Sequence, residues 1–133
     1  MTQVVVGLGL THSATIEQVR TSIDESLALL GLTWDAVAMV ATTERRRDHP
    51  VVHQLTTPGG TALVLFEPTA LAPVTVPNPS AAVGARAGTT SVAEAAALLA
   101  AGTDVLLLPK RTGPGVTVAL AEVTQVVGVA DRS

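Results

Sequence analysis

Cysteine is absent from this chain of 133 residues. Disulfide bonds, thiolate catalysis and cysteine-ligated metal sites are therefore excluded together. Aromatic residues are scarce, at 2% of the sequence, and the formal net charge is -3. Single-stranded nucleic acids are bound largely by stacking on aromatic side chains, and duplexes by a broad basic face. We therefore predict that the chain has no nucleic-acid partner.

Long apolar runs and targeting signals are also missing. No stretch approaches the ~18 consecutive apolar residues that a membrane-spanning helix requires. The N-terminal stretch MTQVVVGLGL has no basic segment and no long apolar core, so it does not resemble a secretory signal. We expect no membrane partner and a cytoplasmic location. The length suits one core, and we predict that residues 1–133 form a single domain.

Short apolar runs alternate with helical patterns along the chain. The short runs rich in Val, Leu and Ala predict β-strands, and they lie at 3–8, 37–42, 61–66, 104–110 and 116–123. Helical spacing or capping signals mark segments at 15–31, 48–55 and 92–101, with a short turn of helix from Thr33. Residues 68–88 are rich in Pro and Ala, and we expect a long ordered loop with one short helix near Ser80.

The order of these segments predicts the fold class. Strands that alternate with helices indicate an α/β fold, and strands that are apolar almost throughout indicate a sheet covered by helices on both faces. A GPG turn at 113–115 joins the last two predicted strands, which should therefore pair antiparallel. We predict a single three-layer domain with a mixed, mostly parallel sheet of about five strands and a C-terminal hairpin.

Local signals predict where the helices begin and end. Thr15 and Gln18 have the spacing of a capping box, and Gly31 is a natural stop for the first helix. Asp48 is expected to cap the next helix, with Pro50 in the first turn, where its missing N–H does no harm.

Glu94 is the one charged residue in the stretch GTTSVAEAAALLAAG at 88–102. Ser91 and Glu94 have the S-x-x-E spacing of a capping box, which explains a lone carboxylate at the start of an apolar helix without any function. The same helix start attracts anions, because its first N–H groups have no partner inside the helix. The two interpretations are compatible, so a pocket that includes Ser91 and Glu94 stays open.

The segment GLGLTHS at 7–13 follows the first predicted strand and leads into the first helix. Open α/β sheets bind ligands at connections of this kind. Gly7 and Gly9 would let the backbone approach a ligand, and Thr11 and His12 offer polar groups, although a tight turn explains the same residues. A dinucleotide fingerprint would need a third glycine where His12 stands, so we reject that motif and predict no cofactor.

Cationic residues at two places are candidate ligand contacts. Arg45, Arg46 and Arg47 follow the second predicted strand. Such a run is commonly a solvated surface, but the forked donors of arginine also suit recognition of carboxylates. Lys110 is the sole lysine and ends a predicted buried strand, at the kind of edge where open α/β sheets place ligands. It is either a ligand contact or a solvated residue before a turn.

Metal and serine-nucleophile chemistry have little support in the sequence. His49 and His53 have the i, i+4 spacing that can chelate on a helix, but no third ligand follows in pattern. We therefore predict no metal site. No G-x-S-x-G motif is present to mark a serine nucleophile.

Several stretches together resemble a known family. They are VVVGLGL, VAMVATTERRRDHPVVHQL, VPNPSAAVGARAGTTSVAEAAALLAAG, LLLPKR and VTVALAEV. The most specific part is the G-T-x-S-V-x-E-A-A-A block with the Pro-Lys element downstream. On these motifs the chain resembles the CobE family, which is similar to the C-terminal domain of CbiG, both of cobalamin biosynthesis. Leu10 and Thr11 stand where family members often carry Cys and Arg.

The resemblance implies a role in cobalamin biosynthesis, whose intermediates are large macrocycles with many carboxylates. We expect an accessory module that binds a precorrin or corrinoid intermediate. One alternative is a hydrolase opening a precorrin lactone, as in cobalt-precorrin-5A hydrolase, with Glu94 or Asp48 as general base and Lys110 polarising a carbonyl. Another is a non-catalytic partner of other cobalamin-biosynthesis enzymes. In CbiG the lactone-opening activity is associated with the whole protein, including N-terminal sequence that these 133 residues do not contain.

The predicted ligand site combines the residues singled out above. Its members are Gly7, Gly9, Thr11, His12, Arg45, Arg46, Ser91, Glu94 and Lys110. Glu94 and Lys110 are also the candidate catalytic residues, because catalysis would need a carboxylate beside a cation in a cleft. Their convergence with the 7–13 segment at one pocket would favour an enzyme.

Overall fold

The computed structural model describes residues 3–56, 61–71, 92–103 and 105–123. The strands are β1 (Val4–Leu10), β2 (Val37–Thr43), β3 (Ala62–Phe66), β4 (Leu108–Gly113) and β5 (Val116–Glu122). The α-helices are α1 (Ile16–Leu29), α2 (Pro50–Thr56), α3 (Pro68–Leu71) and α4 (Val92–Ala101). Short 3-10 helices flank β2, and they are η1 (Trp34–Ala36) and η2 (Glu44–Arg46).

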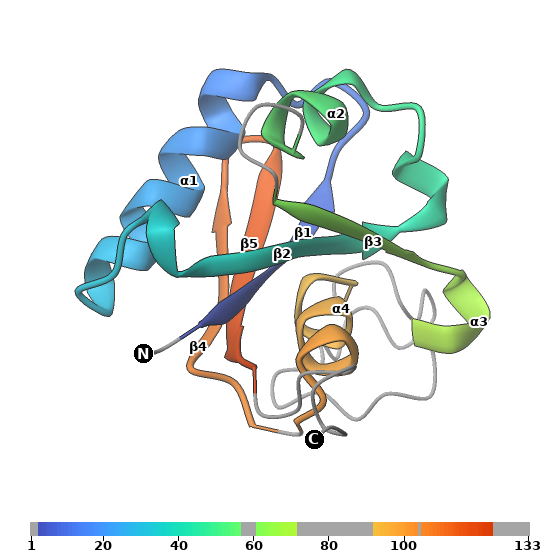
Figure 1. Cartoon of the computed structure of the whole chain (residues 1–133). Helices are drawn as coiled ribbons and strands as arrows, with labels where there is room; N and C mark the ends of the chain where they lie inside the picture. The colour runs from blue at the N-terminus through green and yellow to red at the C-terminus, as the bar shows by residue number, and fades with distance from the viewer. Residues whose placement is uncertain (1–2, 57–60, 72–91, 104, 124–133) are drawn as a thin grey trace.

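The strands form one mixed sheet in the order β3-β2-β1-β5-β4. β1 pairs parallel with β2, and β2 pairs parallel with β3. β5 runs antiparallel to both of its neighbours, so β4 points the same way as β1. Helices α1 and α2 cover one face of the sheet, and α3 and α4 cover the other (Figure 1). The predicted three-layer α/β arrangement, the mixed sheet of five strands with its parallel pairs at one side, and the C-terminal hairpin are therefore confirmed.

The two faces of the sheet carry different cores, because successive residues of a strand point to opposite faces. Toward α1 and α2, β1 presents larger aliphatic side chains, which are Val4, Val6, Leu8 and Leu10. Toward α4, the strands present mostly smaller side chains, which include Ala41, Ala119 and Ala121. Small residues on both surfaces let the alanine-rich helix α4 lie close to the sheet.

The backbone of α4 packs directly against the backbone of β1 at Gly7, where no side chain would fit between them. A Cβ atom at Gly7 would lie 2.0 Å from the carbonyl oxygen of Ala93 and 2.9 Å from the Cβ of Ala97. Only glycine fits at such a distance. Gly7 and Gly9 lie inside β1, so the prediction that a loop begins at residue 7 is wrong. The strand continues to Leu10 because β5 pairs with it over that whole length.

β4 also differs from its predicted bounds. The strand begins at Leu108 rather than at residue 104, and it continues through Gly113. The apolar run before it is not a buried strand, since Val105 and Leu107 are exposed. The prediction that Lys110 ends a buried strand is therefore wrong, and this lysine lies within an edge strand. Antiparallel pairing with β5 extends β4 beyond the apolar run, which composition could not show.

The ends of α1 are set by the residues predicted from the sequence. Oγ1 of Thr15 accepts a hydrogen bond from the N–H of Gln18 (3.2 Å), and Oε1 of Gln18 accepts one from the N–H of Thr15 (3.0 Å). After the helix, Gly31 has a φ of 72°. The N–H of Leu32 then donates back to the carbonyl of Leu27 at 2.9 Å, and the N–H of Gly31 donates to the carbonyl of Ala28 at 3.0 Å. These are the 6→1 and 5→2 hydrogen bonds of a Schellman motif.

Gly31→Ala is expected to lower the free energy of unfolding by about 1 kcal/mol, because L-residues disfavour a positive φ. A Cβ there would meet no atom within 4 Å, so the cost is conformational and not steric. Gly31→Asn is the matched control and should lose less, since Asn tolerates the left-handed region. Urea denaturation measures both variants. A loss for alanine no larger than that for asparagine would contradict this explanation.

The first turn of α2 is capped by His49 rather than Asp48, since Nδ1 of His49 accepts from the N–H of Val51 at 3.2 Å. Helix α3 was not predicted, and the helix expected near Ser80 lies outside the described residues. Within the described ranges, no helix is both long enough and apolar enough to cross a membrane.

Candidate functional site

The C-terminal ends of β1 and β2 meet at one edge of the sheet, beside the start of β5. Thr11 follows β1 and donates from its N–H to the carbonyl of Gly115 at 3.0 Å. Near the end of β2, the buried Oγ1 of Thr42 donates to the carbonyl of Leu8 at 2.8 Å. Because open α/β sheets bind ligands at the carboxyl ends of their parallel strands, this edge is the first candidate site.

Helix α4 begins at the same edge. A Cβ atom on Gly9, near the end of β1, would lie 4.0 Å from the backbone nitrogen of Ala93 in the first turn of α4. The partial positive charge of a helix N-terminus therefore lies beside the end of β1, where it favours anionic groups. Ser91 precedes this helix and lies outside the described residues, so its predicted capping role stays a prediction.

Two side chains in the segment that follows β2 form hydrogen bonds with backbone carbonyls at the end of β1. Nε of Arg46 donates to the carbonyl of Leu10 at 2.9 Å, and Nε2 of His49 lies 3.1 Å from the carbonyl of Thr11. Because Nδ1 of His49 accepts from Val51, the ring proton belongs on Nε2, which donates to Thr11. Among the described residues, no group of three or more side chains that could hold a metal ion occurs.

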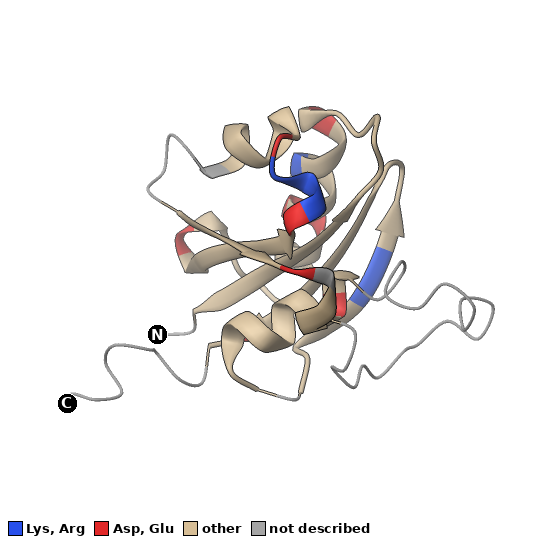
Figure 2. Cartoon of the chain, turned by 90° about the vertical axis from the view of Figure 1, so that its right-hand side faces the viewer, with Lys and Arg blue, Asp and Glu red and all other residues tan. Residues whose placement is uncertain are grey.

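The three arginines have separate roles at this edge. Arg46 donates to the carbonyl of Leu10, as described above, and Arg47 forms an ion pair with Glu44 at 3.4 Å. Arg45 is exposed and forms no ion pair with any residue that the structure describes. Thr11 and the side chain of His12 are exposed at the same end of β1. In Figure 2 the charged residues of η2 lie on the upper part of the molecule, apart from those of β4 at its right.

Glu94 and Lys110 come together, but not in the way predicted. Glu94 is fully buried, at 0% exposure, and its Oε2 accepts from the backbone N–H of Lys110 at 3.0 Å. The pairing of β4 with β5 shifts register between Leu108 and Arg111, and such a shift leaves part of a strand without its ladder partners. The carboxylate of α4 thus satisfies the main chain of β4, and the lysine contributes its amide rather than its ammonium.

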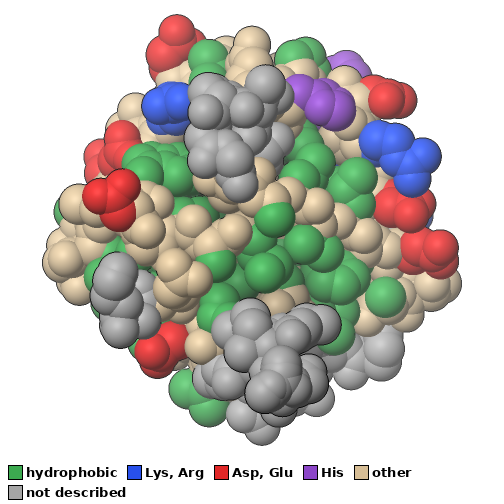
Figure 3. All heavy atoms as spheres, viewed as in Figure 1, with side chains coloured by type: hydrophobic (Ala, Val, Ile, Leu, Met, Phe, Trp, Pro, Cys, Tyr) green, Lys and Arg blue, Asp and Glu red, His purple; other side chains and the backbone are tan. Residues whose placement is uncertain are grey.

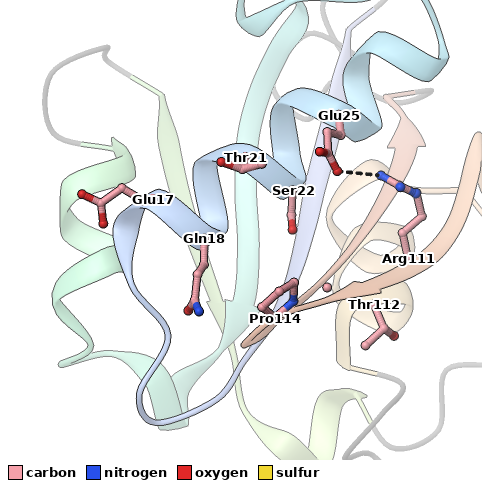
Figure 4. Close-up of a pocket in the computed structure, with 9 residues that line it drawn as sticks. Glu17, Gln18, Thr21, Ser22, Glu25, Arg111, Thr112 and Pro114 are labelled. Atoms are coloured by element: carbon pink, nitrogen blue, oxygen red, sulfur yellow. Dashed lines mark ion pairs between the residues drawn. The ribbon is translucent and has the colours of Figure 1, made fainter.

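A separate groove of about 440 Å³ lies between α1 and the β4–β5 hairpin. Figure 4 shows Ser22 and Glu25 of α1 beside Arg111 of β4. Nη1 of Arg111 lies 3.9 Å from Oε1 of Glu25 and 3.4 Å from Oγ of the buried Ser26. None of the predicted site residues lines this groove. Sequence reasoning missed it because no local motif marks a surface shared by a helix and a strand far apart in the chain.

Comparisons with known proteins identify the family of the chain. The family model described as the cobalamin synthesis G C-terminus matches residues 4–121. A protein of Priestia megaterium, described as cobalt-precorrin-5A hydrolase, is 28% identical over 116 residues, which make up 87% of this chain and 31% of that protein. The chain therefore spans about a third of the length of this curated relative.

Solved structures share the fold. The crystal structure of CobE, a protein of the cobalamin biosynthetic pathway, is 27% identical with a TM-score of 0.77, over 91% of this chain and 90% of that one. Cobalamin biosynthesis protein chiG of Agrobacterium tumefaciens is 25% identical with a TM-score of 0.69, over 92% and 99% of the two chains. A homologue of cobalamin biosynthesis protein G from Sulfolobus solfataricus is 21% identical with a TM-score of 0.73, over 92% of this chain and 37% of that one. The resemblance inferred from the motifs is confirmed.

Proposed function

We propose that this chain, which belongs to the family of the cobalamin synthesis G C-terminus, is an accessory module that binds a carboxylate-rich precorrin or corrinoid intermediate. The proposed site is the edge where β1 and β2 end. The observation that carries the proposal is the exposed guanidinium of Arg45, which forms no ion pair with any described residue. The forked donors of arginine suit carboxylates, which the intermediates of this pathway bear in number.

Other groups at the edge support the binding of an anion. His12 is exposed after β1 and offers an imidazole, whereas the hydroxyl of Thr11 already donates to the carbonyl of Gly115 at 3.3 Å. The N-terminal end of α4 lies beside β1 and adds partial positive charge. Arg46 and His49 hold η2 against β1, so Arg45 is presented from a fixed backbone. An edge that is ordered before the ligand arrives loses less entropy on binding.

The position of Glu94 supports binding rather than lactone hydrolysis. A general base must come within hydrogen-bond reach of the proton that it removes. The carboxylate of Glu94 is fully buried and already accepts the N–H of Lys110. Lys110 lies within β4, away from the ends of β1 and β2. We therefore leave both residues out of the proposed ligand site and propose no catalytic step for them.

Arg45→Ala is expected to raise the Kd for a corrinoid with free carboxylates by about tenfold, because a charge-assisted hydrogen bond contributes roughly 1.5 kcal/mol. The affinity of the unaltered protein should also fall as salt rises from about 50 mM to about 500 mM, since exposed ionic contacts are screened. Absorbance titration of the corrinoid with protein measures both effects.

Two variants and one ligand serve as controls for this titration. Arg111→Ala removes the same charge from the groove between α1 and β4, and Lys110→Ala removes it from the middle of β4. Both should leave Kd within about twofold of the original value. The same corrinoid with esterified carboxylates should bind weakly. Absence of binding at low salt would overturn the proposal and favour a non-catalytic partner of another pathway enzyme.

A further inference from the structure

The two outer strands of the sheet differ in how their edges are protected. A strand edge exposes N–H and C=O groups that can pair with another chain, and proteins commonly block it with proline, charge or a bulge. β4 has all three, because it contains Pro109, Lys110 and Arg111 and its pairing with β5 shifts register at these residues. This edge is therefore unsuited to strand pairing.

β3, at the opposite edge, has none of these features. Its sequence is ALVLF, with neither a charge nor a proline from Ala62 to Phe66. No described strand lies on its outer side, and its side chains are partly or fully exposed. Leu63 is partly buried against the core beneath α1 and α2, and Val64 is partly buried against the core beneath α4. Leu65 belongs to neither cluster. Figure 3 shows hydrophobic side chains gathered on the face that carries β2 and β3.

We propose that β3 pairs antiparallel with β3 of a second copy of this chain, across a two-fold axis at Val64, so that one sheet continues through both copies. In this register Ala62 of each copy lies opposite Phe66 of the other, so the smallest side chain of the strand faces the largest. Leu65 lies opposite Leu63 and gains an apolar neighbour. The strand is therefore complementary to itself, as a two-fold interface requires.

Charge also favours this arrangement. Glu67 follows β3 directly and is exposed, and Thr61 precedes it. The antiparallel register brings Glu67 opposite the neutral Thr61 of the other copy. A parallel, in-register pairing would instead set the two Glu67 carboxylates against each other, which is unfavourable. The inference concerns assembly and does not rest on the proposed ligand.

The oligomeric state tests this proposal first. Sedimentation equilibrium from about 1 μM to about 1 mM should show a species of twice the 13.5 kDa chain mass. Leu65→Lys should shift the equilibrium to monomer by placing a charge in the paired edge. Leu29→Lys is the matched control, since Leu29 is 61% exposed on α1, and it should leave the dimer intact. A monomer at every concentration, or a dimer that Leu65→Lys does not weaken, would overturn the proposal.

Cysteine cross-linking tests the register without depending on how the lysine variant folds. The chain has no cysteine, so Val64→Cys introduces a single thiol. At the two-fold axis the two Cα atoms would lie about 4.5–5.5 Å apart, which suits a disulfide. In Ala62→Cys the thiols would be four residues out of register, roughly 13 Å apart, and should not cross-link. Equal cross-linking of the two variants under mild oxidation, or none in either, would reject the β3 pairing.

Discussion

Gly7→Ala is expected to lower the free energy of unfolding by about 3 kcal/mol, at the upper end of the usual cost of overpacking. The new Cβ would lie 2.0 Å from the carbonyl oxygen of Ala93 and 2.9 Å from the backbone nitrogen of Ala97. Both are backbone atoms of α4, so no side-chain rotation can relieve the contact. The helix would have to move away from β1 and β5, which loosens the whole alanine-lined core.

Gly9→Ala is the matched control for this substitution. It makes the same chemical change two residues along β1, where a Cβ would lie 3.7 Å from the Cβ of Thr117 and 4.0 Å from the nitrogen of Ala93. These are ordinary contacts, so stability should change by less than about 1 kcal/mol, with a gain from reduced freedom of the unfolded chain. Urea denaturation of both variants decides the matter. A loss at Gly7 no larger than at Gly9 would mean that α4 does not contact β1 as described.

Glu94→Leu is expected to lower the free energy of unfolding by about 2 kcal/mol, because it leaves the N–H of Lys110 without its acceptor. Leucine fills a comparable volume and favours helices, so neither a cavity nor a propensity loss complicates the comparison. Glu94→Gln keeps a side-chain oxygen that can accept the same hydrogen bond, and it should lose about 1 kcal/mol or less. Chemical denaturation of the two variants measures the difference.

Hydrogen exchange separates this role of Glu94 from helix capping. If the carboxylate protects the amide of Lys110, then Glu94→Leu should accelerate exchange at that amide while most of β5 stays protected. If Glu94 acts only as a capping residue, exchange should change at the start of α4 and not in β4. An unaltered exchange rate at Lys110 in Glu94→Leu would contradict the hydrogen bond as the source of the lost stability.

Features that depend on neighbouring residues were predictable. The capping box of Thr15 and Gln18 and the stop at Gly31 involve atoms within one turn of helix, and the structure has both. The alanine-rich helix from Val92 to Ala101 has its predicted bounds. The hairpin between β4 and β5 followed from a short turn between two apolar runs. In each case the residues that decide the structure lie close together in the chain.

Roles that depend on distant residues were not predictable from composition and spacing. Gly7 was expected to make room for a ligand, but it makes room for Ala93 and Ala97 of α4. Of the three arginines, only the fold shows that Arg46 binds the carbonyl of Leu10 while Arg45 stays exposed. No motif indicates which arginine will find a backbone partner, because that partner belongs to another strand.

By itself the sequence determined the fold class, the places of most elements, the ends of α1 and the family to which the chain belongs. Each of these depends on local sequence patterns or motifs. Only the tertiary structure decided the strand order, which inserts β5 between β1 and β4. It also decided that Glu94 of α4 bonds to the main chain of Lys110. The physical reason is that apolar runs are interchangeable as strands. Their order, and the partners of buried polar groups, are settled only when the whole core packs and each buried donor must find an acceptor.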